Sequence, residues 1–153
     1  MPALASDESV AVLEFLMGLP KPSRAVIASV EAGAAWFRGA VIYGYAWSGT
    51  REEGRHLTKV GAENSLWARY YSLTTDTPVF GDRDKTIHDD VADLSPERRN
   101  GYAWYNTDGF EMLTKYAVWE QKVHPPGQHN SQPPDAGPGD MHPQPPPPVF
   151  PSM

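Results

Sequence analysis

The chain has 153 residues, no cysteine and a formal net charge of −6, and this length suffices for one domain with a buried core. The lack of cysteine excludes disulfides, thiolate metal sites and a thiol nucleophile. The acidic balance argues against general nucleic-acid binding, which depends on neutralising phosphates, and no apolar run approaches the roughly 18 residues of a membrane span. Residues 1–12 contain Asp7 and Glu8 but no basic residue, which is not typical of a signal peptide.

Proline divides the chain into two parts. Five of the sixteen prolines lie in residues 1–124 and eleven lie in residues 125–153. Such density favours extended polyproline conformation and opposes a packed core. We therefore expect a folded body over residues 1–124 and a disordered proline-rich tail over residues 125–153. The alternative interpretation is that this tail is a ligand for a proline-recognition domain.

The first part of the body predicts an αα-hairpin. Residues 6–7 can cap a helix that starts near Glu8 and ends before Gly18. Ser23 is the expected N-cap of a second helix, and Gly39 is the expected C′ residue just beyond the end of that helix. The apolar positions at helical spacing are Val10, Leu13 and Met17 in the first helix, and Val26, Ile27, Val30, Ala34 and Phe37 in the second.

From residue 40 the pattern changes to the β-branched and aromatic residues that are typical of strands. Residues 48–65 are charged and are predicted to form an exposed segment on the surface. Residues 95–96 predict the start of a helix with proline in its first turn, and residues 109–123 predict a last amphipathic helix. The body is thus predicted to be mainly α-helical with a small β element. The predicted strands are residues 41–47, 66–73 and 79–80.

Two stretches, residues 66–84 and 97–105, interleave arginine with tyrosine and tryptophan, and they hold four of the eight arginines. On an ordinary surface, arginine stacks on aromatic rings and pairs with carboxylates. In a groove, the same groups suit an acidic saccharide, because guanidinium forks match carboxylates and aromatic faces pack on sugar rings. Arg51 and Arg55 lie among acidic residues and glycine, and they are predicted to be solvated surface.

The same stretches carry an ordered series of motifs. Residues 67–84 fit W-A-R-[FY]-Y-x-[IL]-x-T-x-x-P-x-F-G-D-R-D, and residues 97–105 read E-R-R-N-G-Y-A-W-Y. This series resembles the C-terminal part of pectate lyases of polysaccharide lyase family 10. The resemblance covers about residues 2–123. Its upstream matches are residues 2–6, 8–9, 15–17, 22–23 and 35–37.

The resemblance implies a mainly α fold, a fragment of an α/α toroid with a small β element. It also implies Ca²⁺-assisted β-elimination on polygalacturonate (pectate), and a secreted or periplasmic location. The proton removed in that reaction lies α to a uronate carboxylate, so Ca²⁺ and arginines must neutralise the carboxylate first. The base in this family is an arginine, which gives up its proton only in strongly cationic surroundings.

Carried onto this sequence, the resemblance implies that Arg69 and Arg83 bind substrate uronates. Arg99 and Tyr102, in the second motif, are further predicted substrate-binding residues. A structural role in closing the last hairpin is the alternative for this motif, which also holds Arg98 and Tyr105. Asp82 and Asp84 flank Arg83 and are expected to position it. A calcium role for these two carboxylates is the less favoured alternative, since a calcium site needs about six oxygens or more.

Two expected family segments do not occur in this sequence. They are the Asp-Asn-x-Ala-Thr segment, which carries calcium ligands, and the Ala-Arg-x-[Phe/Tyr]-Glu segment, whose catalytic arginine would precede Met1. Thr77 also stands where the family often has a basic residue, and Lys85 where it often has glycine. We therefore expect a C-terminal fragment that contains neither the catalytic residue nor the metal ligands. Ca²⁺ is the cofactor that the family resemblance implies, but its ligands are not expected in this chain.

Such a fragment is expected to be inactive alone. Its expected partner is polygalacturonate, and it is expected to bind neither nucleic acid nor a membrane. A non-catalytic module that binds acidic polysaccharides is the alternative, and an interaction remnant acting through the proline tail is a third hypothesis. A fragment of a toroid should also expose apolar surface, such as the face of the helix over residues 26–37.

Overall fold

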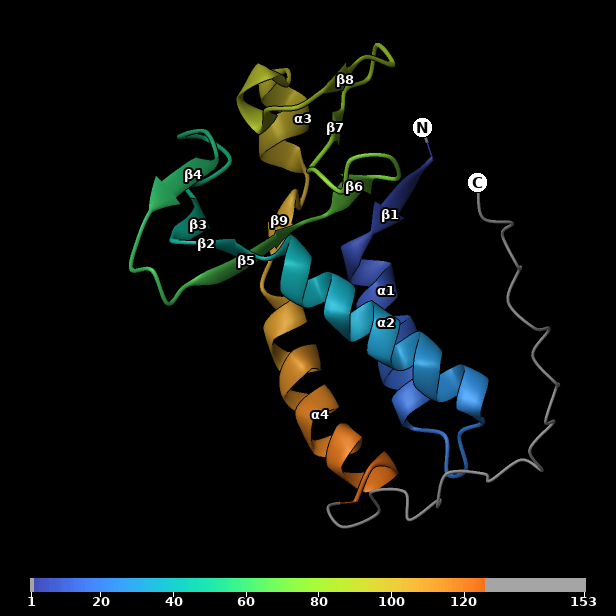
Figure 1. Ribbon diagram of the computed structural model, residues 1–153. Coiled ribbons are helices and arrows are strands. Elements are labelled where there is room, and N and C mark those ends of the chain that lie inside the picture. The colour runs from blue at the N-terminus through green and yellow to red at the C-terminus, as the bar shows by residue number, and fades with distance from the viewer. Residues whose placement is uncertain (1, 126–153) are drawn as a thin grey trace, which may run out of the picture.

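The computed structural model describes residues 2–125. Three long helices gather at one end of the body and the short strands lie at the other (Figure 1). The predicted tail lies outside the described residues from position 126 onward, so its disorder stays a prediction. No helix within residues 2–125 combines the length and the apolar character needed to cross a bilayer.

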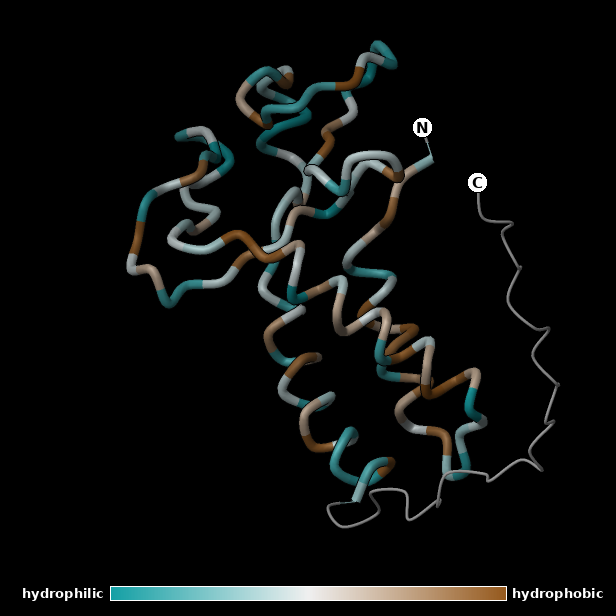
Figure 2. The backbone as a smooth tube through the Cα atoms, in the orientation of Figure 1, coloured by the Kyte–Doolittle hydropathy of each residue, from teal (hydrophilic) through white to brown (hydrophobic). Residues whose placement is uncertain are grey.

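The helical end is built from α1 (Ser6–Met17), α2 (Arg24–Ala40) and α4 (Asp108–Val123). Hydrophobic residues recur along each helix between hydrophilic ones (Figure 2), and their shared core excludes water. The expectation of an exposed α2 face is wrong, because α1 and α4 contribute to the cluster that buries Val30, Ala34 and Phe37. The buried members of this core are Leu13, Val30, Ala34, Phe37, Trp67, Met112, Tyr116 and Trp119.

The helix ends agree only in part with the sequence signals. The αα-hairpin is confirmed, and Ser23 caps α2 by accepting a hydrogen bond from the Val26 amide at 3.3 Å. Gly39 does not end α2, which continues to Ala40. The first helix starts at Ser6 rather than Glu8, because the buried Ser6 hydroxyl donates to the Ala68 carbonyl at 2.8 Å instead of capping α1.

Nine short strands occur in residues 2–125, all paired antiparallel. They form four small sheets in the orders β1–β6, β2–β5–β9, β3–β4 and β7–β8. Two short helical segments, η1 (Val91–Asp93) and α3 (Pro96–Gly101), lie between β8 and β9. The strands are β1 (Ala3–Ala5), β2 (Ile42–Tyr43), β3 (Tyr45–Ser48), β4 (His56–Lys59), β5 (Ser65–Ala68), β6 (Tyr70–Ser72), β7 (Phe80–Gly81), β8 (Ile87–His88) and β9 (Tyr105–Asn106).

Two of the predicted strands are each divided in two. The predicted strand over residues 41–47 breaks at Gly44, whose φ of 77° lies in the left-handed region that glycine tolerates. The predicted strand over residues 66–73 breaks at Arg69. There the backbone turns to two other partners, since the Arg69 amide donates to the Trp104 carbonyl at 2.8 Å and its carbonyl accepts from the Ser6 amide at 2.9 Å.

A second core lies beneath the strands, and large aromatic rings fill it. The Trp104 ring is fully buried and packs edge-on against Phe80 with centroids 5.6 Å apart. Trp67 and Tyr71 tie this region to α2 by donating to the carbonyls of Phe37 and Ala40, each at 2.9 Å. The buried members are Leu66, Ala68, Tyr71, Phe80, Val91, Leu94, Trp104 and Tyr105.

The predicted fold class, a mainly α fragment of an α/α toroid with one small β element, is wrong for the described residues. Three long helices pack on a body of nine strands in four sheets, which is a mixed α and β architecture. The physical reason is long-range pairing: β1 pairs with β6 and β5 pairs with β9. Each strand is too short for its hydrophobic periodicity to predict it from the sequence.

Candidate functional site

Arginine and aromatic side chains from both sequence motifs meet around Tyr102. The guanidinium carbon of Arg98 lies 4.2 Å from the centre of the Tyr102 ring, and that of Arg69 lies 5.1 Å from it. Arg98 also lies 5.0 Å from the Trp104 ring, and the hydroxyls of Tyr70 and Tyr102 are 3.2 Å apart. We call these five residues the Tyr102 cluster. It combines positive charge with aromatic faces, as an acidic sugar requires.

Arg69 is held in the cluster by the first turn of α1. Its Nη1 lies 2.7 Å from the Asp7 carboxylate and its Nη2 lies 2.9 Å from the Glu8 carboxylate. The side chains of Arg69 and Asp7 are 21% and 25% exposed, so solvent screens this ion pair only in part, whereas the Glu8 side chain is largely exposed. The hydrogen bond to Tyr70 and the charge of Asp7 raise the pKa of Arg69 above its ordinary value. The guanidinium is therefore a fixed cation and not a base.

A further layer of polar contacts fixes these acids. Asn106 of β9 donates through Nδ2 to both the Asp7 carboxylate and the Ser6 hydroxyl. Burial raises the pKa of Asp7, and it outweighs the opposing effect of the Arg69 cation. The Arg69 guanidinium is thus oriented from α1 and β9 together, two elements at opposite ends of the described chain.

Arg83 lies on the turn between β7 and β8 and faces solvent. Its side chain is 69% exposed, and its Nε and Nη2 pair with the two oxygens of Glu97 at 2.6 and 2.7 Å. The hydrogen bond to Glu97 and the charge of that carboxylate raise the pKa of Arg83. Because an exposed ion pair contributes little to stability, a uronate carboxylate could replace Glu97 at small cost.

Asp82 joins the β7–β8 turn to the start of α3. Its carboxylate accepts from the Ser95 amide at 2.6 Å, from the Ser95 hydroxyl at 2.8 Å and from the Arg83 amide at 2.7 Å. Arg98 adds a second tie, since its Nε donates to the Gly81 carbonyl at 3.1 Å. These contacts connect the hairpin that carries Arg83 to the Tyr102 cluster.

Arg99 does not join the cluster, although it is adjacent to Arg98 in the sequence. Its Nη1 donates to the Ala92 carbonyl at 3.1 Å, and the side chain lines a cavity together with Arg55. The cluster therefore unites Arg69 and Tyr102 of the predicted residues, has Arg83 on an attached hairpin, and leaves Arg99 on a different surface.

Calcium does not fit the described residues. No three aspartate, glutamate, histidine or cysteine side chains gather in residues 2–125 in a way that could hold a metal ion. The Asp84 carboxylate accepts from the amide and the hydroxyl of Thr86 at 2.9 and 2.5 Å, and Asp82 is committed to Ser95 and Arg83. Hard cations need about six oxygens, which these two carboxylates do not supply.

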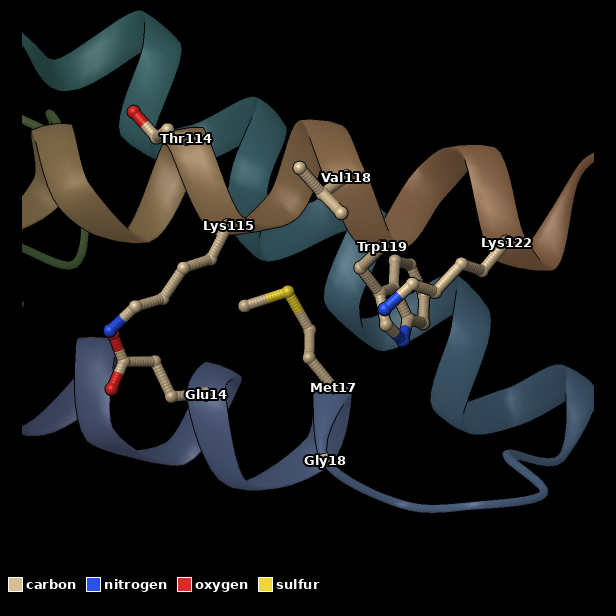
Figure 3. Close-up of a pocket in the computed structure, with 8 residues that line it drawn as sticks. All are labelled: Glu14, Met17, Gly18, Thr114, Lys115, Val118, Trp119 and Lys122. Atoms are coloured by element: carbon tan, nitrogen blue, oxygen red, sulfur yellow. The ribbon is translucent and has the colours of Figure 1, made fainter.

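A cavity of about 530 Å³ between α1 and α4 lies away from this chemistry (Figure 3). At one side of it, the Lys115 ammonium pairs with the Glu14 carboxylate at 2.8 Å, and Met17 and Trp119 supply apolar surface. None of the predicted substrate-binding residues lines this cavity, so we place the candidate site at the Tyr102 cluster.

Residues 1–113 match the sequence model of a family described as pectic acid lyase. The chain belongs to the pectic acid lyase family. The resemblance to family 10 pectate lyases is thereby confirmed, and the match contains every residue of the Tyr102 cluster, Arg83 and Arg99. Comparison with curated proteins gives no match.

Two solved structures of a family 10 polysaccharide lyase from Cellvibrio cellulosa are similar to this pectic acid lyase family chain. One has a TM-score of 0.69 and 30% identity, and covers 77% of this chain and 36% of its own length. The other is an aspartate-to-alanine variant in complex with trigalacturonic acid, with a TM-score of 0.68, 31% identity and coverages of 76% and 36%. The chain thus spans about a third of the length of the structures that it matches.

Sequence reasoning missed two groups in this family member. Asp7 and Glu8 orient Arg69, but the sequence separates them from it by 62 and 61 positions. Arg55 is not solvated surface, because its Nε is buried in the wall of the cavity that it shares with Arg99. Only the long-range contacts of the folded chain reveal either group.

Proposed function

We propose that this chain binds polygalacturonate and supplies substrate-binding residues of a pectate lyase. The observation that carries the proposal is the Tyr102 cluster beside the exposed Arg83, within the residues that match the family. Stacked guanidinium and phenol groups offer a face for a sugar ring, and the fork of Arg83 matches a uronate carboxylate. The complex of the similar Cellvibrio lyase with trigalacturonic acid supports the choice of ligand class.

We further propose that these 153 residues bind the polymer without cleaving it. Proton abstraction needs a base, and both Arg69 and Arg83 have a raised pKa, which suits them to neutralise a uronate and not to accept its proton. The described residues also offer no donor set for calcium. The geometry therefore favours a binding role for this part of the family. A location outside the cytoplasm belongs to the proposal because the family resemblance implies it.

Calorimetry with trigalacturonate tests the binding proposal directly. Saturable binding that persists in EDTA is expected, because the proposed contacts are guanidinium and aromatic groups. Galactose trisaccharide without carboxylates is the matched neutral ligand and should bind much more weakly. Equal affinity for the two trisaccharides, or no binding of either, would overturn the proposal.

Ultraviolet absorbance of unsaturated uronates tests the second part. With polygalacturonate and Ca²⁺, the 153-residue protein is expected to yield no product while it still binds trigalacturonate. Steady product formation that survives repeated purification would show that the chain cleaves its substrate unaided.

A further inference from the structure

A cavity of about 280 Å³ lies between the segment leading into β4 and the segment containing η1 and α3. Two arginines from these separate segments, Arg55 and Arg99, line it together. Neither takes part in the Tyr102 cluster described above. The cavity is therefore a second place where guanidinium groups from distant parts of the sequence converge.

Both arginines keep unused donors in this cavity wall. The Nε atoms of Arg55 and Arg99 are buried and have no hydrogen-bond partner within residues 2–125. Neither side chain forms an ion pair with a carboxylate of the described residues. Buried donors are normally paired, and Arg69 and Arg83 in this same chain are each paired with carboxylates. Arg99 uses its Nη1 to donate to the Ala92 carbonyl at 3.1 Å, so the donors left without an acceptor are the two Nε–H groups, and a carboxylate is an acceptor that suits them.

The segment that carries Arg55 is docked against α3 before any ligand binds. The Arg55 amide donates to the Asn100 side-chain oxygen at 2.8 Å. Gly54 has a φ of 89°, and a Cβ there would lie 3.9 Å from Nη2 of Arg99. The positive φ favours glycine at this position, whereas a Cβ would make only an ordinary van der Waals contact with the Arg99 guanidinium. The backbone of Arg55 is thus held on Asn100, and the Arg99 side chain is held on the Ala92 carbonyl at 3.1 Å, which lowers the cost of ordering the two residues around a ligand.

Charge and size narrow the choice of ligand. The charged side chains on the wall are Arg55, Arg99 and Asp90, which leaves one net positive charge and disfavours a doubly charged phosphate. Leu57 and Val91 add apolar wall, against which a sugar ring can pack. The volume of about 280 Å³ lies just below the range of about 300–1,000 Å³ for small-molecule pockets, so one sugar residue fits and a longer oligomer does not.

We propose that this cavity binds the carboxylate of a single uronate residue, with the Nε–H groups of Arg55 and Arg99 as its donors. This site goes beyond the proposed polymer-binding surface and does not require it. The ligand class follows from the two unpartnered Nε–H groups, one net positive charge and an apolar wall, all within one cavity.

Arginine side-chain Nε–H resonances in the full 153-residue protein provide the test. Titration with D-galacturonate should shift the resonances of Arg55 and Arg99 saturably, because their buried Nε–H groups gain an acceptor. D-galactose, the matched neutral sugar, should leave both unshifted. Equal shifts with the two sugars, no shift with galacturonate, or tighter binding of inorganic phosphate than of galacturonate would each overturn the proposal.

Charge-preserving variants locate the site. Arg55→Lys and Arg99→Lys remove the Nε–H donors but keep the charge, and each should weaken galacturonate binding about tenfold. Arg51→Lys, at an exposed position of the same loop, is the matched control and should bind like the parent; equal weakening by this variant contradicts the proposal. If a lysine variant fails to fold by circular dichroism, the wild-type comparison of galacturonate with galactose still decides.

The experiments distinguish failure of the proposed polymer binding from failure of the proposed cavity site. Arg83→Ala should weaken trigalacturonate binding while the Arg55 and Arg99 resonances still respond to galacturonate. Retained polymer binding with unresponsive Arg55 and Arg99 resonances would refute only the cavity site.

Discussion

Arg83 and Glu97 form a two-point ion pair that joins the β7–β8 hairpin to α3, with contacts of 2.6 and 2.7 Å. Both side chains are more than half exposed. If Arg83 binds a uronate as proposed, the Glu97 carboxylate holds the place of the ligand on the Arg83 fork, so we expect Glu97 to compete with it.

This competition predicts opposite effects for the two halves of the pair. Arg83→Ala should weaken trigalacturonate binding several-fold, because the exposed fork is lost. Glu97→Gln should strengthen binding, because the fork is no longer neutralised by a carboxylate. Calorimetry measures both. Arg24→Ala, at an exposed position at the start of α2, serves as the charge-matched control and should leave affinity unchanged. Weaker binding by Glu97→Gln would contradict the competition.

Two Tyr102 variants distinguish stacking from hydrogen bonding in the cluster. Tyr102→Phe keeps the ring beneath Arg69 and Arg98 but removes the hydroxyl that lies 3.2 Å from the Tyr70 hydroxyl. We expect it to bind trigalacturonate almost as well as the parent. Tyr102→Ala removes the ring and should lose most of the affinity. Similar losses in the two variants would assign the role to the hydroxyl instead.

Local sequence pattern predicted the helices because a helix buries one face at a fixed spacing. Val30, Ala34 and Phe37 follow that spacing and are buried in α2. The sheets were not predictable in this way. Their register depends on partners far apart in the chain, such as Trp67 opposite Asn106 and Ala5 opposite Tyr70, and no local period encodes that pairing.

The candidate site, like the fold, could be predicted from the sequence only where local motifs carry the information. The motif order singled out Arg69 and Tyr102, which do meet, but it could not tell that Arg99 faces elsewhere than Arg98. Asp7 and Glu8 look like ordinary acids in a first helical turn, where the helix dipole favours them. The charged neighbours of Arg55 predict solvated surface, whereas the contact that docks its backbone on Asn100 is long-range and has no local signal in the sequence.

The buried hydroxyl of Ser6 predicts a cost in stability when it is removed. It donates to the Ala68 carbonyl at 2.8 Å in a fully buried position, so Ser6→Ala leaves that carbonyl without this donor and should lower the free energy of unfolding by about 1–3 kcal/mol. Ser29→Ala is the matched control, since its hydroxyl also donates to a carbonyl at 2.8 Å but is exposed; its effect should stay within about 0.5 kcal/mol. Urea unfolding measures both, and equal losses would contradict a special role for Ser6.

Asp82 predicts part of the acid sensitivity of the fold. Hydrogen bonds from the Ser95 and Arg83 amides lower the pKa of Asp82 in the folded chain. A lowered folded pKa contributes stability that is present above the ordinary pKa of about 4 and is lost as pH falls through the folded value. Asp82→Asn removes this titration, so its melting temperature should fall less steeply than that of the parent as pH drops below about 4. Parallel curves for the two proteins would show that Asp82 contributes nothing to the acid limb.

The packing around Gly109 predicts that replacing it by alanine, a better helix former, destabilises α4. A Cβ at this buried position would lie 2.7 Å from the Trp67 ring, so the ring or the helix must move. Overpacking of this kind costs about 1–3 kcal/mol, which exceeds the gain of up to about 1 kcal/mol in helix propensity from glycine to alanine. Gly109→Ala should therefore lower the midpoint of thermal unfolding. Gly39→Ala in α2 has the same change in propensity but no atom within 4 Å of the new Cβ, so it should raise the midpoint. A higher midpoint in both variants would mean that Trp67 yields without cost and that α4 is not fixed by this contact.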